Sequence, residues 1–259
     1  MFRRHRVLTV LAAVGFVLAA AHAGPAPPRV LMVTYSAGYE HEVVRRPAAG
    51  ELSTAERAVT ELGRRSRAFE VTHVATREDL ARLTPASVRA HRAILFFTTG
   101  ELPIAAPVRQ AMFDAVRQGG GFVGVHSATD TWYAVPEYGD LIGARFDSHP
   151  WHQRVRLLVE DRAHPATREL GEALEIKDEI YQFREWARRD VHVLLRLDAR
   201  SVDAARGKRA DGDYALAWTK AYGRGRVVYT ALGHDPEIWA DARFRSHLAG
   251  AIGWALGGP

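Results

Sequence analysis

The feature that most constrains this chain is a regular alternation of short, continuously apolar runs with segments of helical periodicity. Strands that are apolar along their whole length, rather than at every second residue, belong to a sheet covered on both faces. Such runs predict strands at 30–33, 69–74, 93–97 and 122–125. The order of strands and helices predicts an α/β fold with a doubly wound, mostly parallel, flavodoxin-like sheet.

Local signals place two helices between these strands. Ser53 and Glu56 have the spacing of a capping box, which predicts a helix that starts there and ends at Gly63. Pro107 suits the first turn of a second helix, and the glycines at 119–121 end it and lead into the next strand.

The second half of the chain carries further apolar runs and a closing helix. Strands are predicted at 155–159, 191–197, 215–218 and 227–231, and apolar residues recur at helical spacing from Phe244 to Ala255. The chain has 259 residues, of which 47% are hydrophobic, enough for one sizeable core. With no repeat and no shift in composition, residues 29–257 are predicted to form a single domain.

The N-terminal stretch resembles an export signal. Arg3, Arg4 and Arg6 precede an apolar run at 7–21, and Ala-His-Ala at 21–23 suits signal peptidase. The run is shorter than the roughly 20 residues that span a bilayer. We therefore expect a signal peptide at 1–23, a Pro-rich spacer at 24–28, and a mature protein in the periplasm or the medium without a membrane anchor.

Charge and cysteine content narrow the possible partners. The chain has 35 basic and 30 acidic residues, so that loss of the three arginines of the signal leaves 32 against 30. This scattered excess supplies no basic stripe, and nucleic acid is not an expected partner. Since the chain has no cysteine, any metal must be held by His, Asp or Glu. Neither a nucleotide nor a flavin is expected, and the sequence leaves the oligomeric state open.

The segment 119–128 has the shape of a nucleophile elbow. Gly124 and Ala128 are the small residues two before and two after the tip, which puts His126 at the tip and Ser127 one residue out of register. A reactive His126 is one interpretation; a glycine-rich turn with a hydrogen-bonded histidine is the other.

A second histidine follows the predicted strand 227–231. His234 precedes Asp235 and Pro236, and a carboxylate beside it can fix its tautomer for a role as general base or metal ligand. Asp235 is equally suited to cap a helix that Pro236 begins.

Several motifs together resemble the ThuA-like (trehalose utilisation) family over essentially 29–257. They are Gly-Gly-Gly-Phe-Val-Gly-Val-His-Ser-Ala-Thr-Asp (119–130), His149-Pro150, the segments 159–161 and 164–167, Asp178-Glu179-Ile180-Tyr181, Leu216-Ala217-Trp218 and Tyr229-Thr230-Ala231-Leu232-Gly233-His234. The resemblance implies the fold of class I glutamine amidotransferases, whose elbow cysteine matches His126 and whose partner histidine matches His234. Without the cysteine, glutamine hydrolysis is not expected.

The family implies a small carbohydrate as substrate, either a trehalose-type disaccharide or a keto-sugar. Metal-assisted or His/Glu acid–base hydrolysis, elimination or isomerisation would suit such a substrate, with Zn²⁺ or another divalent transition ion as the possible metal. The candidate catalytic residues are His126, His234 and Glu179. The candidate metal ligands are His41, His126, His149 and His234. The candidate substrate-binding residues are Tyr39, Gly100, Ser127, Asp130, Trp132, Trp151 and Asp235.

Two other interpretations stay open. A non-catalytic sugar-binding module would keep the same crevice and recognise its ligand by aromatic stacking. A hydrolase with Ser127 as nucleophile is the weaker one, because Ser127 is out of register at the elbow.

Overall fold

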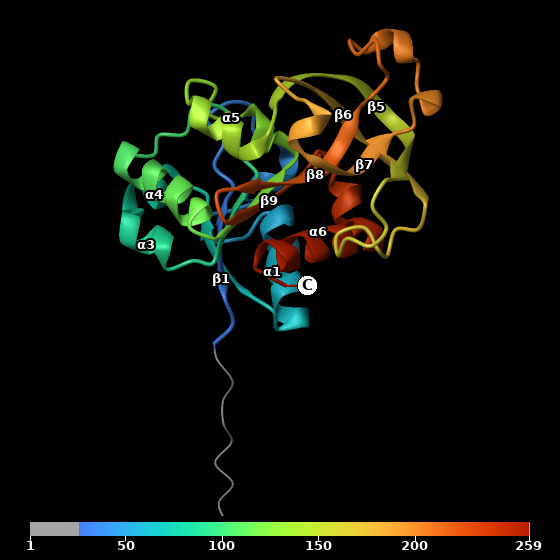
Figure 1. The fold of residues 1–259 in the computed structure, drawn as a ribbon. Coiled ribbons are helices and arrows are strands. Elements are labelled where there is room, and N and C mark those ends of the chain that lie inside the picture. The colour runs from blue at the N-terminus through green and yellow to red at the C-terminus, as the bar shows by residue number, and fades with distance from the viewer. Residues whose placement is uncertain (1–25, 259) are drawn as a thin grey trace, which may run out of the picture.

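A computed structural model describes residues 26–258, which form one mixed sheet of nine strands in the order β2-β1-β3-β4-β9-β8-β7-β5-β6 (Figure 1). The strands are β1 Arg29–Val33, β2 Glu70–Val74, β3 Ala93–Phe96, β4 Gly121–Val125, β5 Arg145–Val159, β6 Ala173–Arg184, β7 His192–Leu197, β8 Ala215–Tyr222 and β9 Gly225–Thr230.

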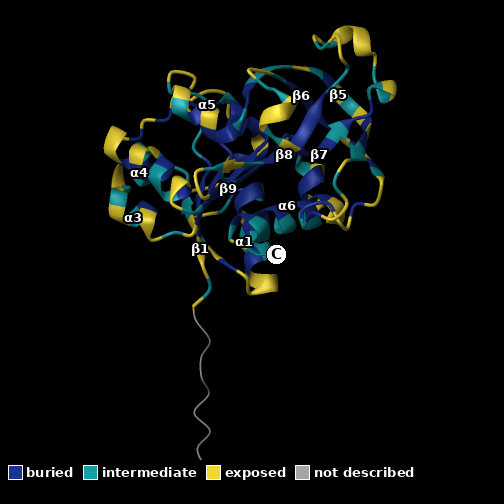
Figure 2. Ribbon diagram, viewed as in Figure 1, coloured by how far each residue is buried: buried dark blue, intermediate teal, exposed yellow. Residues whose placement is uncertain are grey.

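The first five strands of that order are parallel, which confirms the predicted flavodoxin-like core. β3 and β4 are buried along their whole length, because helices cover both faces of the sheet (Figure 2). The helices are α1 Thr54–Ser66, α2 Arg77–Arg82, α3 Pro85–Arg89, α4 Ala106–Arg117, α5 Pro136–Ile142 and α6 Ala242–Ala255. The short 3-10 helices are η1 Glu42–Val44, η2 His126–Asp130, η3 Arg188–Asp190, η4 Ala199–Ser201, η5 Ala204–Arg206 and η6 Pro236–Ala240.

The other half of the sheet is antiparallel, and the sequence prediction was incomplete here. β6 was not predicted, and β5 starts at Arg145 rather than at residue 155. Two register shifts, between Phe146 and Ser148 and between Ser148 and Trp151, break the alternation along β5. In β6 the buried positions include Asp178, Glu179 and Gln182, so polar residues mask the apolar period of a strand.

The predicted capping box at the start of α1 is confirmed. The backbone N–H of Glu56 donates to Ser53 Oγ at 3.3 Å, and the backbone N–H of Ser53 donates to Glu56 Oε2 at 2.8 Å. The predicted end at Gly63 was wrong, because α1 continues to Ser66. A Cβ at Gly63 would lie 2.5 Å from the carbonyl oxygen of Phe69, so this glycine serves close packing inside the helix.

The predicted signal peptide at 1–23 lies outside the described residues, as do the first residues of the spacer. Within 26–258, no helix combines the length and the apolar character that crossing a bilayer requires.

Candidate functional site

The predicted elbow places His126 directly after β4, at the carboxyl edge of the parallel strands. The backbone φ of His126 is +47°, a left-handed conformation that bulky residues rarely adopt. A Cβ at Gly124 would lie 3.0 Å from atoms of Ile142 and Tyr229 and 3.3 Å from Cβ of Ala128. The small residues around the tip are therefore required by packing, and His126 is fixed in a strained turn.

The hydrogen bonds of His126 determine which ring nitrogen faces the crevice. Nδ1 lies 2.7 Å from the carbonyl oxygen of Ala231 and, since a carbonyl only accepts, Nδ1 carries the proton. In the neutral ring, Nε2 is then the nitrogen that carries the lone pair. It lies 3.2 Å from Nδ1 of His234 and 3.5 Å from Oε2 of Glu179.

Glu179 and His234 complete a compact cluster with His126 and His41. Glu179 projects from β6, and its Oε2 lies 3.1 Å from Nδ1 of His234, which follows β9. His41 comes from the loop after β1 and is 4% exposed. These four residues each offer one nitrogen or oxygen, and the four atoms lie within 4.8 Å of one another. We call these four residues the histidine–glutamate cluster.

Burial and mutual contacts set the ionisation of the cluster. Burial would by itself raise the pKa of Glu179, but its contacts with His126 and His234 outweigh burial and hold that pKa well below the usual range. Burial by itself would lower the pKa of His234. The hydrogen bond and the negative charge of Glu179 more than offset this effect of burial, so the pKa of His234 is raised. Burial, together with the neighbouring His126 and His234, lowers the pKa of His41 to about 3. Glu179 is thus ionised at neutral pH and His41 is neutral.

Asp178, next to Glu179 on β6, holds the loop that carries His234. Its carboxylate accepts backbone N–H groups from Gly233 at 2.7 Å, from His234 at 3.1 Å and from Asp235 at 3.1 Å. Burial nevertheless raises the pKa of Asp178. The dipeptide Asp178-Glu179 therefore supplies both a cluster residue and the support of the loop that carries His234.

The cluster borders a crevice of about 310 Å³. Its walls are Tyr39, His41, Asp130, Phe146, His149, Glu179, Tyr181 and His234. Tyr39 is 66% exposed at this crevice, and its ring packs edge-on against His41. His149 is half-exposed, and its Nδ1 lies 3.1 Å from Glu179 Oε1. Burial raises the pKa of Asp130, whose Oδ1 accepts the hydroxyl of Tyr133 at 2.7 Å.

The structure places both predicted tryptophans in the core rather than at the crevice. Trp132 is 1% exposed and packs against Phe96, Phe113 and Tyr138. Trp151 is fully buried, and its Nε1 donates to the carbonyl of Asp203 at 3.0 Å. Neither ring is accessible to a sugar.

Three other predicted substrate-binding residues also have their polar groups turned elsewhere. The backbone N–H of Gly100 donates to the carbonyl of Asp130 at 2.7 Å and is not free to stabilise an oxyanion. Ser127 is fully buried, and among the described residues its Oγ has no hydrogen-bond partner. Asp235 occupies the position before η6 without a capping hydrogen bond from its side chain, and accepts Nε2–H of His152 at 2.8 Å instead.

Sequence reasoning assigned no role to two residues of the crevice wall. The ring of Tyr181 lies 4.3 Å from that of His126, and the ring of Phe146 lies 4.4 Å from that of Tyr181. Tyr181 is two residues after Glu179, so the period of a strand would have found it had β6 been predicted. Phe146 lies just before a register shift of β5 and has no such signal.

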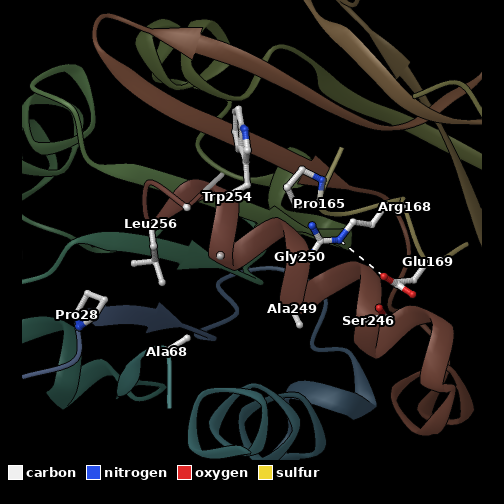
Figure 3. Close-up of a pocket in the computed structure, with 12 residues that line it drawn as sticks. Pro28, Ala68, Pro165, Arg168, Glu169, Ser246, Ala249, Gly250, Trp254 and Leu256 are labelled. Atoms are coloured by element: carbon white, nitrogen blue, oxygen red, sulfur yellow. Dashed lines mark ion pairs between the residues drawn. The ribbon is translucent and has the colours of Figure 1, made fainter. Parts of the chain in front are cut away.

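A larger hollow of about 730 Å³ lies along α6, away from the cluster (Figure 3). Its described walls include Pro28, Ala68, Trp254 and Leu256, and its charged side chains are Arg168 and Glu169, which pair with each other at 3.8 Å. Among the described residues, these walls bring no histidine or pair of carboxylates together, whereas the walls of the smaller crevice bring both together.

Comparisons with known proteins bear on the family and the fold of this chain. The family model described as "Trehalose utilisation", ThuA, matches residues 29–255. The solved structure of a putative ThuA-like protein from Bacteroides uniformis aligns with a TM-score of 0.70 at 22% identity, over 91% of this chain and 94% of that one. A putative ThuA-like protein from Parabacteroides merdae gives 0.71 at 18% identity, over 89% and 90%.

A more distant structure has the same fold. PurLQS from Thermotoga maritima aligns with a TM-score of 0.50 at 15% identity, over 88% of this chain and 99% of that chain. A comparison with curated proteins gives no match.

Proposed function

The chain belongs to the ThuA family, and from this premise we propose that it is an enzyme acting on a carbohydrate, either a trehalose-type disaccharide or a keto-sugar glycoside. The observation that carries the proposal is the histidine–glutamate cluster, in which His126, His234 and Glu179 lie within 3.5 Å of one another beside a crevice of about 310 Å³. That crevice lies at the carboxyl edge of the parallel strands, where α/β folds bind their ligands.

The cluster has the groups needed for proton transfer. Glu179 is ionised, and its Oε2 lies 3.1 Å from Nδ1 of His234, whose pKa it raises; this contact favours the protonated imidazole. A protonated His234 can give its proton to a leaving oxygen, and the neutral imidazole can then take one from a sugar hydroxyl or from a carbon next to a carbonyl. Hydrolysis, elimination and isomerisation of a sugar all use these steps, whereas glutamine hydrolysis by this superfamily's route would need a thiol at His126.

The crevice wall suits a neutral, hydroxyl-rich ligand. The exposed ring of Tyr39 offers an apolar face for a sugar ring, and the half-buried Asp130 offers an acceptor for hydroxyl groups. We assign substrate binding to Tyr39 and Asp130, and catalysis to His126, His234 and Glu179.

The test is conversion of trehalose and of its keto derivative by the purified protein, followed by NMR of the products. His234→Gln and Glu179→Gln are expected to lower turnover at least about 100-fold, the usual contribution of a general acid or base. His192→Ala is the matched control, because His192 is exposed and pairs with Asp161 outside the crevice. Unchanged turnover in both cluster variants would refute the assignment.

The exposed Tyr39 also supports a second candidate, a sugar-binding module without catalysis. Aromatic recognition at the crevice needs no proton transfer, so sugar binding would survive in His234→Gln and Glu179→Gln. Calorimetric binding of trehalose, equal in wild type and variants and without product after long incubation, would select this function.

A further inference from the structure

We propose that the histidine–glutamate cluster is a mononuclear site for a divalent transition metal, with Zn²⁺ as the ion that its donors suit best. His41, His126 and His234 supply imidazole nitrogens, and Glu179 supplies a carboxylate oxygen. Three imidazoles and one carboxylate are donors that zinc and related first-row ions prefer over calcium or magnesium.

The spacing of three donors fits a tetrahedral ion. Ligands about 2.0–2.1 Å from a tetrahedral zinc stand about 3.3 Å from one another. Nε2 of His126, Nδ1 of His234 and Oε2 of Glu179 are separated by 3.2, 3.5 and 3.1 Å. Three such donors form one face of a tetrahedron without movement of the backbone.

His41 provides an independent observation. Its side chain is 96% buried, since only 4% of the residue is exposed, and among the described residues its Nδ1 has no hydrogen-bond partner. A buried polar nitrogen without a partner costs free energy unless something binds it. A metal ion that took Nδ1 of His41 as a ligand would satisfy this nitrogen.

The surroundings of the ligands are those of a metal site. Metal-bound histidines commonly donate their second ring N–H to a carbonyl or carboxylate, as Nδ1 of His126 does to Ala231. His149 contacts the other oxygen of Glu179 at 3.1 Å. The sequence predicted His149 as a metal ligand. This proposal instead places His149 in the outer sphere and makes Glu179 the fourth ligand.

The inference deepens the proposed function and rests on it for the role of the ion. The four donors border the crevice, so a sugar carbonyl or hydroxyl that reached the ion from the crevice would be a further ligand and would be polarised by the metal. The ion would then take the place of the proton between His234 and Glu179. Asp130 and His149 would be the crevice residues available for proton transfer.

The experiment is a metal titration that needs no sugar. The whole protein, purified without a histidine tag and stripped with chelator, is titrated with ZnCl₂ by calorimetry and with CoCl₂ by visible absorption. We expect the protein to bind one equivalent of each ion, and we expect bound Co²⁺ to show the visible spectrum of four- or five-coordinate cobalt. Glu179→Gln and His234→Ala should each weaken binding more than the roughly 10–100-fold that loss of an outer-sphere partner causes. The loss of metal affinity in His149→Ala should fall within that range, and His192→Ala should bind the metal as tightly as the wild type does.

Two results would overturn the site: no bound ion in the stripped and reloaded wild type, or equal affinity in wild type and both ligand variants. Circular dichroism of Glu179→Gln, a nearly isosteric change, separates loss of a ligand from loss of folding. Turnover of a sugar at the full rate by the metal-free protein would remove the role of the metal in the reaction and keep the carbohydrate function. Stoichiometric metal without any sugar conversion would keep the site and remove the proposed function.

Discussion

Asp178 accepts the backbone N–H of Gly233 at 2.7 Å, which ties β6 of the antiparallel half to the loop after β9 in the parallel half. The same carboxylate accepts the N–H groups of His234 and Asp235. The position of His234 therefore depends on a buried charge on a different strand.

The first prediction concerns this positioning residue. Asp178→Asn removes the charge and turns one acceptor into a donor facing backbone N–H groups, so we expect a loss of about 1–3 kcal/mol in the free energy of unfolding. Chemical denaturation measures this loss. Glu175→Gln, on an exposed position of β6, is the control and should change stability by less than about 0.5 kcal/mol. Equal stability of the two variants would contradict the role of Asp178.

The second prediction uses two helical glycines. Gly63→Ala in α1 should destabilise, because its Cβ would meet the carbonyl of Phe69 at 2.5 Å. Gly253→Ala in α6 has nothing within 4 Å of its Cβ and should stabilise by about 0.5–1 kcal/mol through helix propensity. Thermal unfolding of the two variants checks the opposite signs; a gain in melting temperature for Gly63→Ala would disprove the packing argument.

The third prediction is a pH dependence away from the crevice. Burial lowers the pKa of His247 from 6.5 to about 4, and its Nδ1–H donates to the carbonyl of Ala166. Between those two values the unfolded chain binds more protons at this residue than the folded one does. Stability should therefore fall as the pH drops from 6.5 to 4, with about 3 kcal/mol from this histidine.

His247→Asn tests the sign, because its amide can keep the donor to Ala166 while it cannot be protonated. Urea denaturation at a series of pH values should show a shallower loss of stability for the variant than for the wild type. Identical slopes would mean that His247 titrates normally in the folded protein.

The fourth prediction concerns recognition at the crevice. Tyr39→Ala should weaken sugar binding by about 0.5–1.5 kcal/mol, roughly 2- to 12-fold, because it removes an exposed aromatic face. Tyr39→Phe keeps the ring and should bind nearly as well as the wild type. Calorimetric titration compares the three proteins, and a Tyr39→Ala variant of full affinity would show that the sugar binds elsewhere.

The fifth prediction concerns export. Expression of the full chain in a Gram-negative host should give a processed protein that begins at Gly24, read by N-terminal sequencing of the periplasmic fraction. Ala23→Arg disrupts the small-residue pattern before that position and should block processing. An unprocessed wild-type chain in the cytoplasm would refute the signal.

Local patterns along the chain were enough to predict the parallel half of the fold. Continuous apolar runs and local caps, such as the pair Ser53 and Glu56, are short-range signals, and they located β1, β3, β4 and α1. The elbow at His126 was also predicted from the sequence, because the sharp turn leaves room only for small residues such as Gly124 and Ala128. The position of His234 after a predicted strand made it a candidate, and resemblance to a family then indicated Glu179.

How those residues meet depends on long-range packing and could not be predicted from local patterns. β6 carries buried polar residues and β5 is interrupted by register shifts, so neither strand shows a full period of two. That these two strands form part of the crevice wall was therefore not predicted. The contact between Glu179 and His234 joins residues from distant segments, which no local pattern encodes. For the same reason, two candidate substrate-binding residues, Trp132 and Trp151, are in the core: their burial is set by long-range packing rather than by their neighbours in the chain.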